Sequence, residues 1–466
     1  MAGLEALFSA QRVAFAARTP TYDDRMRALA ALRDGLLGCE AMLAEAITKD
    51  FGRRSPDETR LLEILPLADL IRHTRRSLGS WMKPTRARST WFLLPSRAYT
   101  IPQPLGVVGI IGAWNYPLLL TLGPLIDAIA SGNHAIVKPS ELAPATASAL
   151  TAMIADTFPS TYVAAVTGGP DVAEGLVSLP LDHVIFTGSA RVGQLVMRAA
   201  SANLTPVTLE LGGKCPAIIH SSFPLEIALR RILAGKLYNA GQTCLAPDYL
   251  LVTAGSESRI VQRASDVVRG LYPTLVANPD YTRIVNGTRY AALQRLVADA
   301  AARGARVVTL NSASEACDAD NRVFPPTLIF GAPLDAEVMR EEIFGPILPV
   351  VEYDSLDAAI TFVNARPRPL ALYYFDRDRS RIDRVIRTTV SGGVTINDVV
   401  LHIAQHNLPF GGVGASGMGH YHGRAGFEQL SKRKGVMIQA RRPFTSWFAP
   451  PFTDAKRKWI RLLLRR

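Results

Sequence analysis

One of the four cysteines in the chain lies in a segment suited to nucleophilic chemistry. Cys244 follows small and polar residues in the run Asn239-Ala-Gly-Gln-Thr and is followed by Leu-Ala-Pro247. This composition predicts a turn that keeps bulky side chains away from the thiol. A cysteine attacks as its thiolate, which needs hydrogen-bond donors or positive charge nearby. Because a lone cysteine is more often an inert core residue, the case for Cys244 depends on its companions.

Two other polar residues end apolar runs and could assist such a nucleophile. Glu210 precedes two glycines that permit a tight turn and the close approach of another group. A carboxylate beside a pocket can act as a general base once burial raises its pKa. Asn115, in the run Trp-Asn-Tyr-Pro, could donate its amide to a developing oxyanion. For an isolated glutamate, a helix cap or an ion-pair partner is the better interpretation of Glu210, and a turn residue is the alternative for Asn115.

Two segments have the composition of a dinucleotide site. Gly188 and Ser189 follow an apolar run and open a helical one, so the backbone could approach a phosphate at a helix N-terminus. Lys138 and Glu141 close another apolar run, where they suit the hydroxyls of a ribose. The first segment is neither a P-loop nor the common glycine fingerprint. A plain strand-to-helix turn and a surface ion pair are the competing interpretations.

A strand, turn and helix rhythm from residue 105 onward predicts the elements that position these residues. Apolar, β-branched runs are typical of buried parallel strands, and apolar positions recur at helical spacing through residues 1–80. The pattern predicts an α/β fold: a doubly wound parallel-sheet dinucleotide-binding domain, a second α/β catalytic domain and a small β oligomerisation arm. A helix should run from Pro117 to about Ala130, and Pro139 should open the next. The predicted strands are 107–111, 134–137, 162–166 and 183–186.

Length and composition agree with a globular chain of two or three domains. The chain has 466 residues, of which 48% are hydrophobic and 20% charged. Four cysteines match neither a zinc site nor a disulfide framework, which favours a reducing compartment and predicts no metal. The uncharged stretch 98–126 contains four prolines, so it predicts buried core and not a membrane span.

The net charge of +12 is concentrated at one end of the chain. Residues 431–466 hold eleven Lys and Arg against one acid, so the remainder is almost neutral and no nucleic-acid partner is expected. The ending KRKWIRLLLRR is basic and amphipathic. It predicts weak peripheral contact of residues 455–466 with an anionic membrane. A tail packed on a partner subunit, or a solvated one, is the alternative.

Taken together, these segments resemble the aldehyde dehydrogenase superfamily over nearly the whole chain. The short N-terminus, GQTCLAPDY and SGMGHYHG are similar to its class 3 branch, and the run from Asn397 to Arg424 is most similar to bacterial coniferyl aldehyde dehydrogenases. The motifs, in order, are WNYP at 114–117, KPSE at 138–141, FTGS at 186–189, LELGGK at 209–214, GQTC at 241–244, EEIFGP at 341–346 and PFGG at 409–412.

The resemblance implies a role for each matching residue. Cys244 is implied as the nucleophile, Glu210 as the base that activates water, and Asn115 with the Cys244 amide as the oxyanion hole. The implied cofactor is NAD, with NADP left open. Its implied contacts are Trp114, Lys138, Glu141, Gly188, Ser189, Gly193, Leu211, Glu342 and Phe344. The implied substrate contacts are Tyr116, Leu120 and Thr243.

The resemblance also implies a cytoplasmic homodimer that oxidises an aldehyde to its acid through a cysteine thioester. The substrate is expected to be aromatic, such as coniferyl aldehyde, or a medium- or long-chain aliphatic aldehyde. A cysteine acyl hydrolase or acyltransferase without a redox cofactor, and a non-catalytic protein on the same fold, remain alternatives. The expected division is 1–80 with 101–210 for NAD(P) binding, 211–395 for catalysis, 81–100 with 396–430 for oligomerisation and bridging, and 431–466 as a basic tail.

Overall fold

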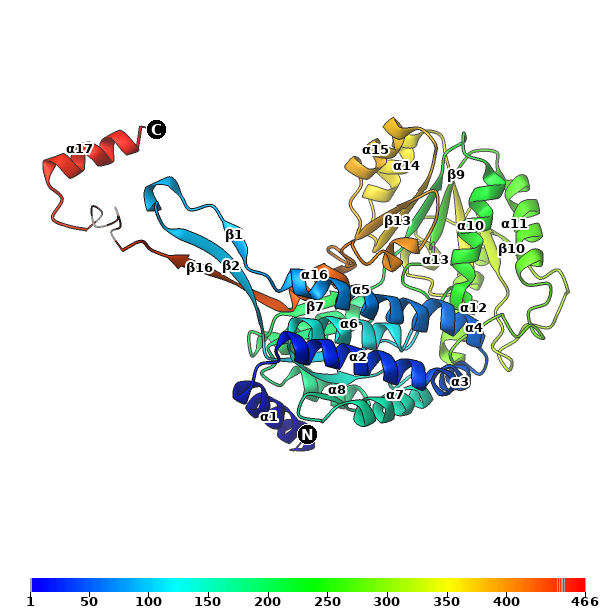
Figure 1. The fold of residues 1–466 in the computed structure, drawn as a ribbon. Helices are drawn as coiled ribbons and strands as arrows, with labels where there is room; N and C mark the ends of the chain where they lie inside the picture. The colour runs from blue at the N-terminus through cyan, green and yellow to red at the C-terminus, as the bar shows by residue number, and fades with distance from the viewer. Residues whose placement is uncertain (1, 442, 444, 446, 448, 466) are drawn as a thin grey trace.

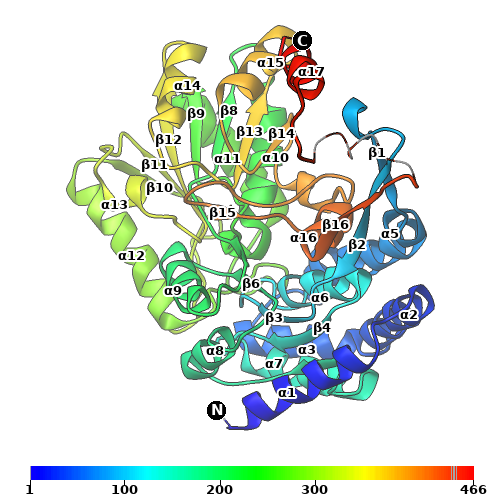
Figure 2. The same cartoon turned by 90° about the vertical axis from the view of Figure 1, so that its left-hand side faces the viewer.

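Two α/β lobes and a projecting β arm make up the molecule in a computed structural model (Figure 1). The structure describes residues 2–441, 443, 445, 447 and 449–465. Figure 2 shows the first lobe in the lower half of the view and the second lobe above it. This arrangement confirms the predicted fold class of a parallel-sheet dinucleotide-binding domain joined to a second α/β domain.

The first lobe is built on a six-stranded sheet with the order β15-β7-β6-β3-β4-β5. The chain adds strands on one side of β3 and then crosses to the other side, so the sheet is doubly wound with a switch point between β3 and β6. Only β15 is antiparallel to its neighbour. The strands are β3 (Val107–Ile111), β4 (His134–Lys138), β5 (Val163–Ala165), β6 (His183–Thr187), β7 (Val207–Glu210) and β15 (Gly417–Met418).

Helices cover both faces of this sheet. Helices α6 and α7 pack on one face with α2, α3 and α5 behind them, while α1, α8 and α9 pack on the other. The helical elements of this lobe are α1 (Ala2–Ala17), α2 (Tyr22–Gly38), α3 (Glu40–Phe51), α4 (Pro56–Thr59), the π turn η1 (Arg60–Ile64), α5 (Leu65–Trp81), α6 (Leu119–Ser131), α7 (Pro144–Thr157), α8 (Pro170–Val177) and α9 (Ala190–Ser201).

One predicted helix start is wrong. Helix α7 begins at Pro144 and not at Pro139, with Ala143 as its N-cap. Both prolines could occupy the first helical position, which has no use for a backbone N–H. The segment between them stays in a turn, in which Lys138 pairs with Glu141. The sequence pattern could not choose between the two prolines.

The second lobe contains a seven-stranded sheet with the order β10-β11-β12-β9-β8-β13-β14. All neighbours are parallel except β10 and β11. Its strands are β8 (Pro216–Ile219), β9 (Tyr249–Thr253), β10 (Arg306–Thr309), β11 (Thr327–Phe330), β12 (Ile347–Tyr353), β13 (Ala371–Phe375) and β14 (Gly393–Ile396). Its helices are α10 (Leu225–Leu237), η3 (Tyr238–Gly241), α11 (Glu257–Leu271), α12 (Gly287–Ala302), α13 (Glu337–Arg340), α14 (Leu356–Asn364), α15 (Arg379–Thr388) and η4 (Leu401–Ala404).

The arm is a three-stranded antiparallel sheet made from distant parts of the chain. Strand β2 (Arg97–Pro104) pairs with β1 (Thr85–Ala87) on one side and with β16 (Ser431–Ile438) on the other. Residues 431–438, expected in the basic tail, are therefore part of the arm, because their backbone completes the edge of β2. The remaining elements are η2 (Trp91–Leu93), α16 (Gly423–Gln429) and α17 (Asp454–Leu463), which lies at the far end of the arm (Figure 1). Within the described residues, no helix is both long and apolar enough to cross a bilayer.

Candidate active site

A tight left-handed turn carries Cys244 from the end of α10 into the interior. Asn239 and Ala240 have φ values of 52° and 51°, and Gly241 follows at 76°. A Cβ atom on Gly241 would lie 2.3 Å from the carbonyl oxygen of Gly345, so only glycine fits this close approach of two backbones. The small residues before the thiol therefore reverse the chain direction in a confined space.

Cys244 lines a cavity of about 870 Å³ that both lobes enclose. The carboxyl ends of β3, β4, β6 and β7 supply the first-lobe wall, which is where an open α/β sheet binds its ligands. The second lobe supplies Cys244 and Glu342, among others. Asn115, Glu210 and Cys244 thus meet at one cavity, although up to 129 positions separate them in the sequence.

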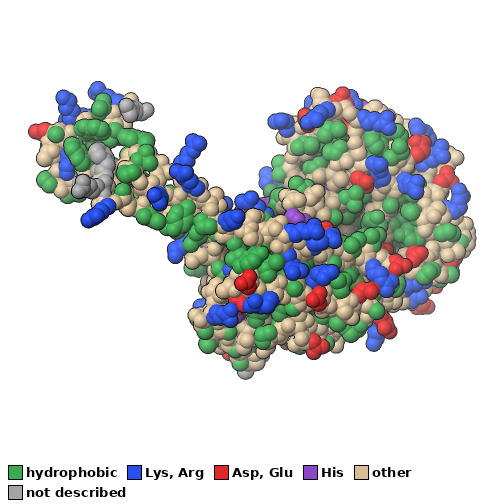
Figure 3. Space-filling view, viewed as in Figure 1, with side chains coloured by type: hydrophobic (Ala, Val, Ile, Leu, Met, Phe, Trp, Pro, Cys, Tyr) green, Lys and Arg blue, Asp and Glu red, His purple; other side chains and the backbone are tan. Residues whose placement is uncertain are grey.

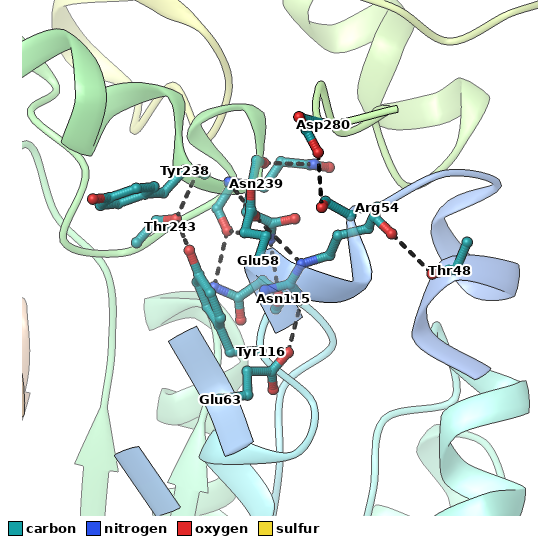
Figure 4. Close-up of polar contacts among 12 residues, drawn as sticks. Thr48, Arg54, Glu58, Glu63, Asn115, Tyr116, Tyr238, Asn239, Thr243 and Asp280 are labelled. Carbon is teal, nitrogen blue, oxygen red and sulfur yellow. Dashed lines mark hydrogen bonds and ion pairs between the residues drawn. The ribbon is translucent and has the colours of Figure 1, made fainter. Parts of the chain in front are cut away.

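Asn115 lies in the turn between β3 and α6 and is only 3% exposed. Its Nδ2 donates to the carbonyl oxygen of Gln242 at 3.1 Å. Its own carbonyl oxygen accepts a hydrogen bond from Asn239 Nδ2 at 2.8 Å (Figure 4). One amide hydrogen is therefore committed to the cysteine turn, and the second is left to reach a group in the cavity.

Glu210 ends β7 and is held in the cavity wall with little access to water. It is 3% exposed, and neither carboxyl oxygen has a hydrogen-bond partner within the described part of the chain. Burial raises the pKa of Glu210 well above its ordinary value. A carboxyl group in this environment accepts a proton near neutral pH, as a general base requires.

The thiol of Cys244 is protonated at neutral pH in this structure. Burial raises its pKa to about 12, and the nearby carboxyl groups of Glu342 and Glu210 add to the shift. Catalysis by this thiol therefore needs a proton acceptor or a positive charge brought into the cavity.

The other end of the cavity fits a dinucleotide. Ser189 caps α9 by accepting a hydrogen bond from the Val192 amide, and the first turn of this helix faces the cavity. A Cβ atom on Gly188 would lie 2.5 Å from the ring of Phe186, so glycine at this position lets the ring pack against the turn that opens α9. Lys138 Nζ lies 2.8 Å from Glu141 Oε2 on the neighbouring wall, where ribose hydroxyls would find a donor and an acceptor.

Glu342 and Phe344 reach the same cavity from the second lobe. Glu342 Oε1 accepts a hydrogen bond from the Gly213 amide at 3.1 Å, and burial raises its pKa to about 7. The ring of Phe344 meets that of Trp114 edge to face, with 5.4 Å between centroids. This aromatic contact joins the two lobes beside the space between Cys244 and Lys138.

Of the five remaining residues that the sequence nominated, two line the cavity and three do not. Leu120 and Leu211 belong to its wall. Tyr116 and Thr243 are buried behind it, where the Tyr116 hydroxyl lies 2.7 Å from Thr243 Oγ1. A Cβ atom on Gly193 would contact the Leu211 side chain at 2.8 Å, so this glycine allows α9 to pack closely on β7.

No site role was predicted from the sequence for several residues that line the cavity. Ile403, Phe410 and Tyr421 belong to this group. Tyr421 is almost fully buried, and its hydroxyl has no hydrogen-bond partner in the described residues. Phe410 and Tyr421 pair through their backbones. The motif PFGG contains Phe410, but no pattern in the sequence indicated that this residue lines the same cavity as Cys244.

Comparisons with known proteins agree with this geometry. The profile described as "Aldehyde dehydrogenase family" matches residues 4–436. A probable coniferyl aldehyde dehydrogenase from Pseudomonas aeruginosa is 47% identical over 464 residues, covering 99% of this chain and 96% of the relative. Aldehyde dehydrogenase family 3 member A2 from Mus musculus is 40% identical, covering 94% and 90%. A substrate-bound structure of Staphylococcus aureus AldH superposes with a TM-score of 0.92 at 38% identity, covering 99% of both chains.

Proposed function

The chain belongs to the aldehyde dehydrogenase family and is an NAD(P)-dependent aldehyde dehydrogenase, and we propose that Cys244, Glu210 and Asn115 carry out its reaction. This membership removes the non-redox acyl hydrolase and the non-catalytic protein from the alternatives. The observation that supports the three assignments is their convergence on one cavity whose far end suits a dinucleotide.

The proposed reaction begins when the Cys244 thiol releases its proton to solvent and the thiolate attacks the aldehyde carbon. The Asn115 side-chain amide and the Cys244 backbone N–H donate hydrogen bonds to the resulting oxyanion. A nicotinamide cofactor held in the cavity would supply the hydride acceptor, so that the substrate remains on Cys244 as a thioester. Glu210 then takes a proton from water, whose oxygen attacks the thioester carbon. The carboxylic acid departs and the Cys244 sulfur is restored.

The cofactor is proposed to lie between α9 and the far wall of the cavity. Gly188 and Ser189 would hold its pyrophosphate, Lys138 and Glu141 its adenosine ribose, and Glu342 its nicotinamide ribose. The Trp114, Leu211 and Phe344 side chains complete the walls beside it. Glu141 keeps its carboxylate at the edge of this space, where it would repel a 2′-phosphate. NAD is therefore the proposed cofactor, with NADP used less well.

An aromatic aldehyde, of which coniferyl aldehyde is the model, is the proposed substrate. The name of the Pseudomonas aeruginosa relative supports this choice. The wall near Cys244 also supports it, because Leu120, Ile403, Phe410 and Tyr421 give it an apolar and aromatic surface. Medium- and long-chain aliphatic aldehydes are the competing class.

Steady-state rates with a panel of aldehydes test these assignments. We expect kcat/KM for coniferyl aldehyde with NAD to exceed that for octanal and decanal by about tenfold or more, since a shaped pocket discriminates by a few kcal/mol. NADP should lower kcat/KM by about tenfold or more, because the Glu141 carboxylate opposes its extra phosphate. Faster oxidation of decanal would reject the aromatic assignment, and equal rates with both cofactors would reject the role of Glu141.

The arm is the proposed site of homodimer formation. It projects from the first lobe, as Figure 1 shows, and leaves large apolar side chains exposed at its tip and along β16. These side chains are Trp91, Leu94, Met437 and Ile438. An arm that is solvated on both faces lacks a core of its own, so a second subunit is the proposed cover.

Helix α17 is proposed to touch the inner face of the cytoplasmic membrane. It presents Lys456, Arg457, Lys458 and Arg461 together with the exposed apolar residues Ile460 and Leu462. Figure 3 shows basic and apolar side chains gathered around the end of the arm.

We expect the full chain to sediment with phosphatidylglycerol vesicles and a chain of residues 1–440 to stay in solution. We also expect both chains to be dimers. Equal sedimentation would reject membrane contact, and a monomeric full chain would reject the dimer.

A further inference from the structure

Three charged residues form a buried cluster directly behind the cavity, and none of them lines it. Arg54 and Glu63 are both 0% exposed, and the Glu58 side chain is also almost fully buried. They come from the short helix α4, the π turn η1 and the residues just before them. The reaction proposed above uses none of these groups.

Arg54 binds the turn that carries Asn115. Its Nη1 donates to Glu63 Oε1 at 2.8 Å and to the carbonyl oxygen of Asn115 at 3.3 Å. Its guanidinium carbon lies 4.9 Å from the centroid of the Tyr116 ring. Figure 4 shows these residues side by side. The guanidinium therefore fixes the backbone of Asn115 and the side chain of its neighbour at the same time.

Glu63 binds the other end of the same turn. Its Oε2 accepts hydrogen bonds from the backbone amides of Leu118 at 2.8 Å and Leu119 at 3.1 Å, where α6 begins. Glu63 lies in the π turn η1, and such a turn inserts an extra residue that re-aims the side chains of a helix. The Arg54–Glu63 pair thus holds the segment from Asn115 to Leu119 at both ends.

Glu58 extends the cluster to the turn that carries Cys244. Its Oε1 lies 3.4 Å from Arg54 Nε and accepts a hydrogen bond from the Asn239 backbone amide at 2.8 Å. Asn239 in turn donates from Nδ2 to the Asn115 carbonyl oxygen at 2.8 Å. The two turns are therefore tied to each other directly and, through Arg54, to a common ion cluster.

We propose that Arg54, Glu58 and Glu63 are positioning residues that set the distance between the Asn115 amide and the Cys244 sulfur. The inference rests on the catalytic roles proposed for Asn115 and Cys244. Buried ion pairs are a poor source of net stability, because desolvation offsets their attraction. Their hydrogen bonds are directional, however, and an apolar cluster of the same volume would not fix two backbone turns. A misplacement of about 1 Å in a reacting group can cost about 100-fold in rate.

The test measures single turnovers with enzyme in excess over coniferyl aldehyde at saturating NAD. At a saturating excess of enzyme, the rate constant of NADH formation then reports the chemistry of correctly folded molecules, and the amplitude equals the amount of aldehyde that they consume. Arg54→Lys keeps the charge but loses the planar fork, and we expect its rate constant to fall at least about 30-fold. The Kd for NAD should stay within about threefold, because the cluster does not line the cavity.

Arg25→Lys is the matched control. Arg25 is also buried, and it donates to the carbonyl oxygens of Pro20 and of Ala130, near the far end of α6 from Asn115. We expect this variant to lower Tm and to leave the single-turnover rate constant within about threefold of the parent. A purely structural role for Arg54 would give Arg54→Lys the same behaviour, and that result would overturn the proposal.

The variants Glu63→Gln and Glu63→Ala provide a second, independent test of the proposal. Gln keeps an oxygen that can accept from the Leu118 and Leu119 amides, whereas Ala keeps none. We expect Gln to retain at least about tenfold more of the rate constant than Ala. Equal rate constants for the two would overturn the proposal even if Arg54→Lys fails to fold. A parent chain that forms no NADH from any aldehyde would instead reject the proposed function.

Discussion

Replacing Cys244 with alanine is expected to lower aldehyde-dependent NADH formation by about 10⁴-fold or more. The substitution removes the sulfur that must bond to the substrate carbon, and no other thiol among the described residues lines the cavity. NAD binding should persist, because the dinucleotide end of the cavity is built from β4, β6 and α9. Steady-state absorbance at 340 nm and calorimetric titration with NAD measure the two quantities.

Cys317→Ala is the matched control for this experiment. Cys317 is a second free cysteine of intermediate exposure, and it lies in the loop 311–320, away from the cavity lining. Its loss should leave kcat/KM within about threefold of the parent. Retained NADH formation in Cys244→Ala, or an equal loss in Cys317→Ala, would contradict the assignment of Cys244 as the nucleophile.

Glu210→Gln is expected to separate the two halves of the reaction. The amide keeps the shape of the side chain but cannot take a proton from water, so the thioester on Cys244 should accumulate. We expect about one equivalent of NADH per active site, followed by a steady-state rate lowered by about 10²- to 10⁴-fold. Intact-protein mass spectrometry should show the acyl group on the chain. A normal first turnover followed by an undiminished steady state would refute the role of Glu210 as the base.

Asp127→Asn is the control for the loss of a buried acid. Burial raises the pKa of Asp127 to about 8, and this residue of α6 is absent from the cavity lining. Its substitution should reduce the first turnover and the steady state by the same small factor, with no acyl adduct.

The pH dependence of kcat follows from the environment of Glu210. Burial raises the pKa of its carboxyl group, and the base form is the deprotonated one. The rate limited by deacylation should therefore fall as the pH decreases through this raised pKa, well above 4.5. A kcat that stays constant from pH 8 down to about pH 5 would contradict this account, because an ordinary glutamate titrates near 4.3.

The sequence predicted the four first-lobe strands β3 to β6 well, because nearly all of their residues are buried. Val107–Ile111 is an unbroken apolar run and the strand that starts at His134 has an apolar centre, and no exposed face interrupts their pattern. The two-residue strand β15 escaped prediction, because its only cause is a pairing of Gly417 with Glu210 far along the chain. Strand β16 was missed for a similar reason, since its basic residues resemble a solvated tail until β2 is placed beside it.

The residues of the candidate site also divide into those that the sequence could indicate and those that it could not. Residues that end predicted strands, such as Lys138 and Glu210, could be nominated because a parallel sheet gathers its ligands at that edge. Arg54 and Glu63 could not be nominated from the sequence, because charged residues spaced along a helix are ordinarily solvated. Only the packing of α4 and η1 against the turns at 115 and 239 reveals that these charges are buried. Family resemblance supplied the role of Cys244, which its local sequence alone did not settle.

The arm also has a consequence for biosynthesis. Strand β2 is complete about 330 residues before β16 leaves the ribosome. At ordinary translation speeds, one of its edges stays open for roughly 15 to 65 s. An unpaired strand edge is a template for wrong partners, so nascent chains would benefit from a chaperone that shields residues 97–104 during this interval. The arm can be completed only after residues 431–438 have left the ribosome, and subunits can join through the complete arm only after that step.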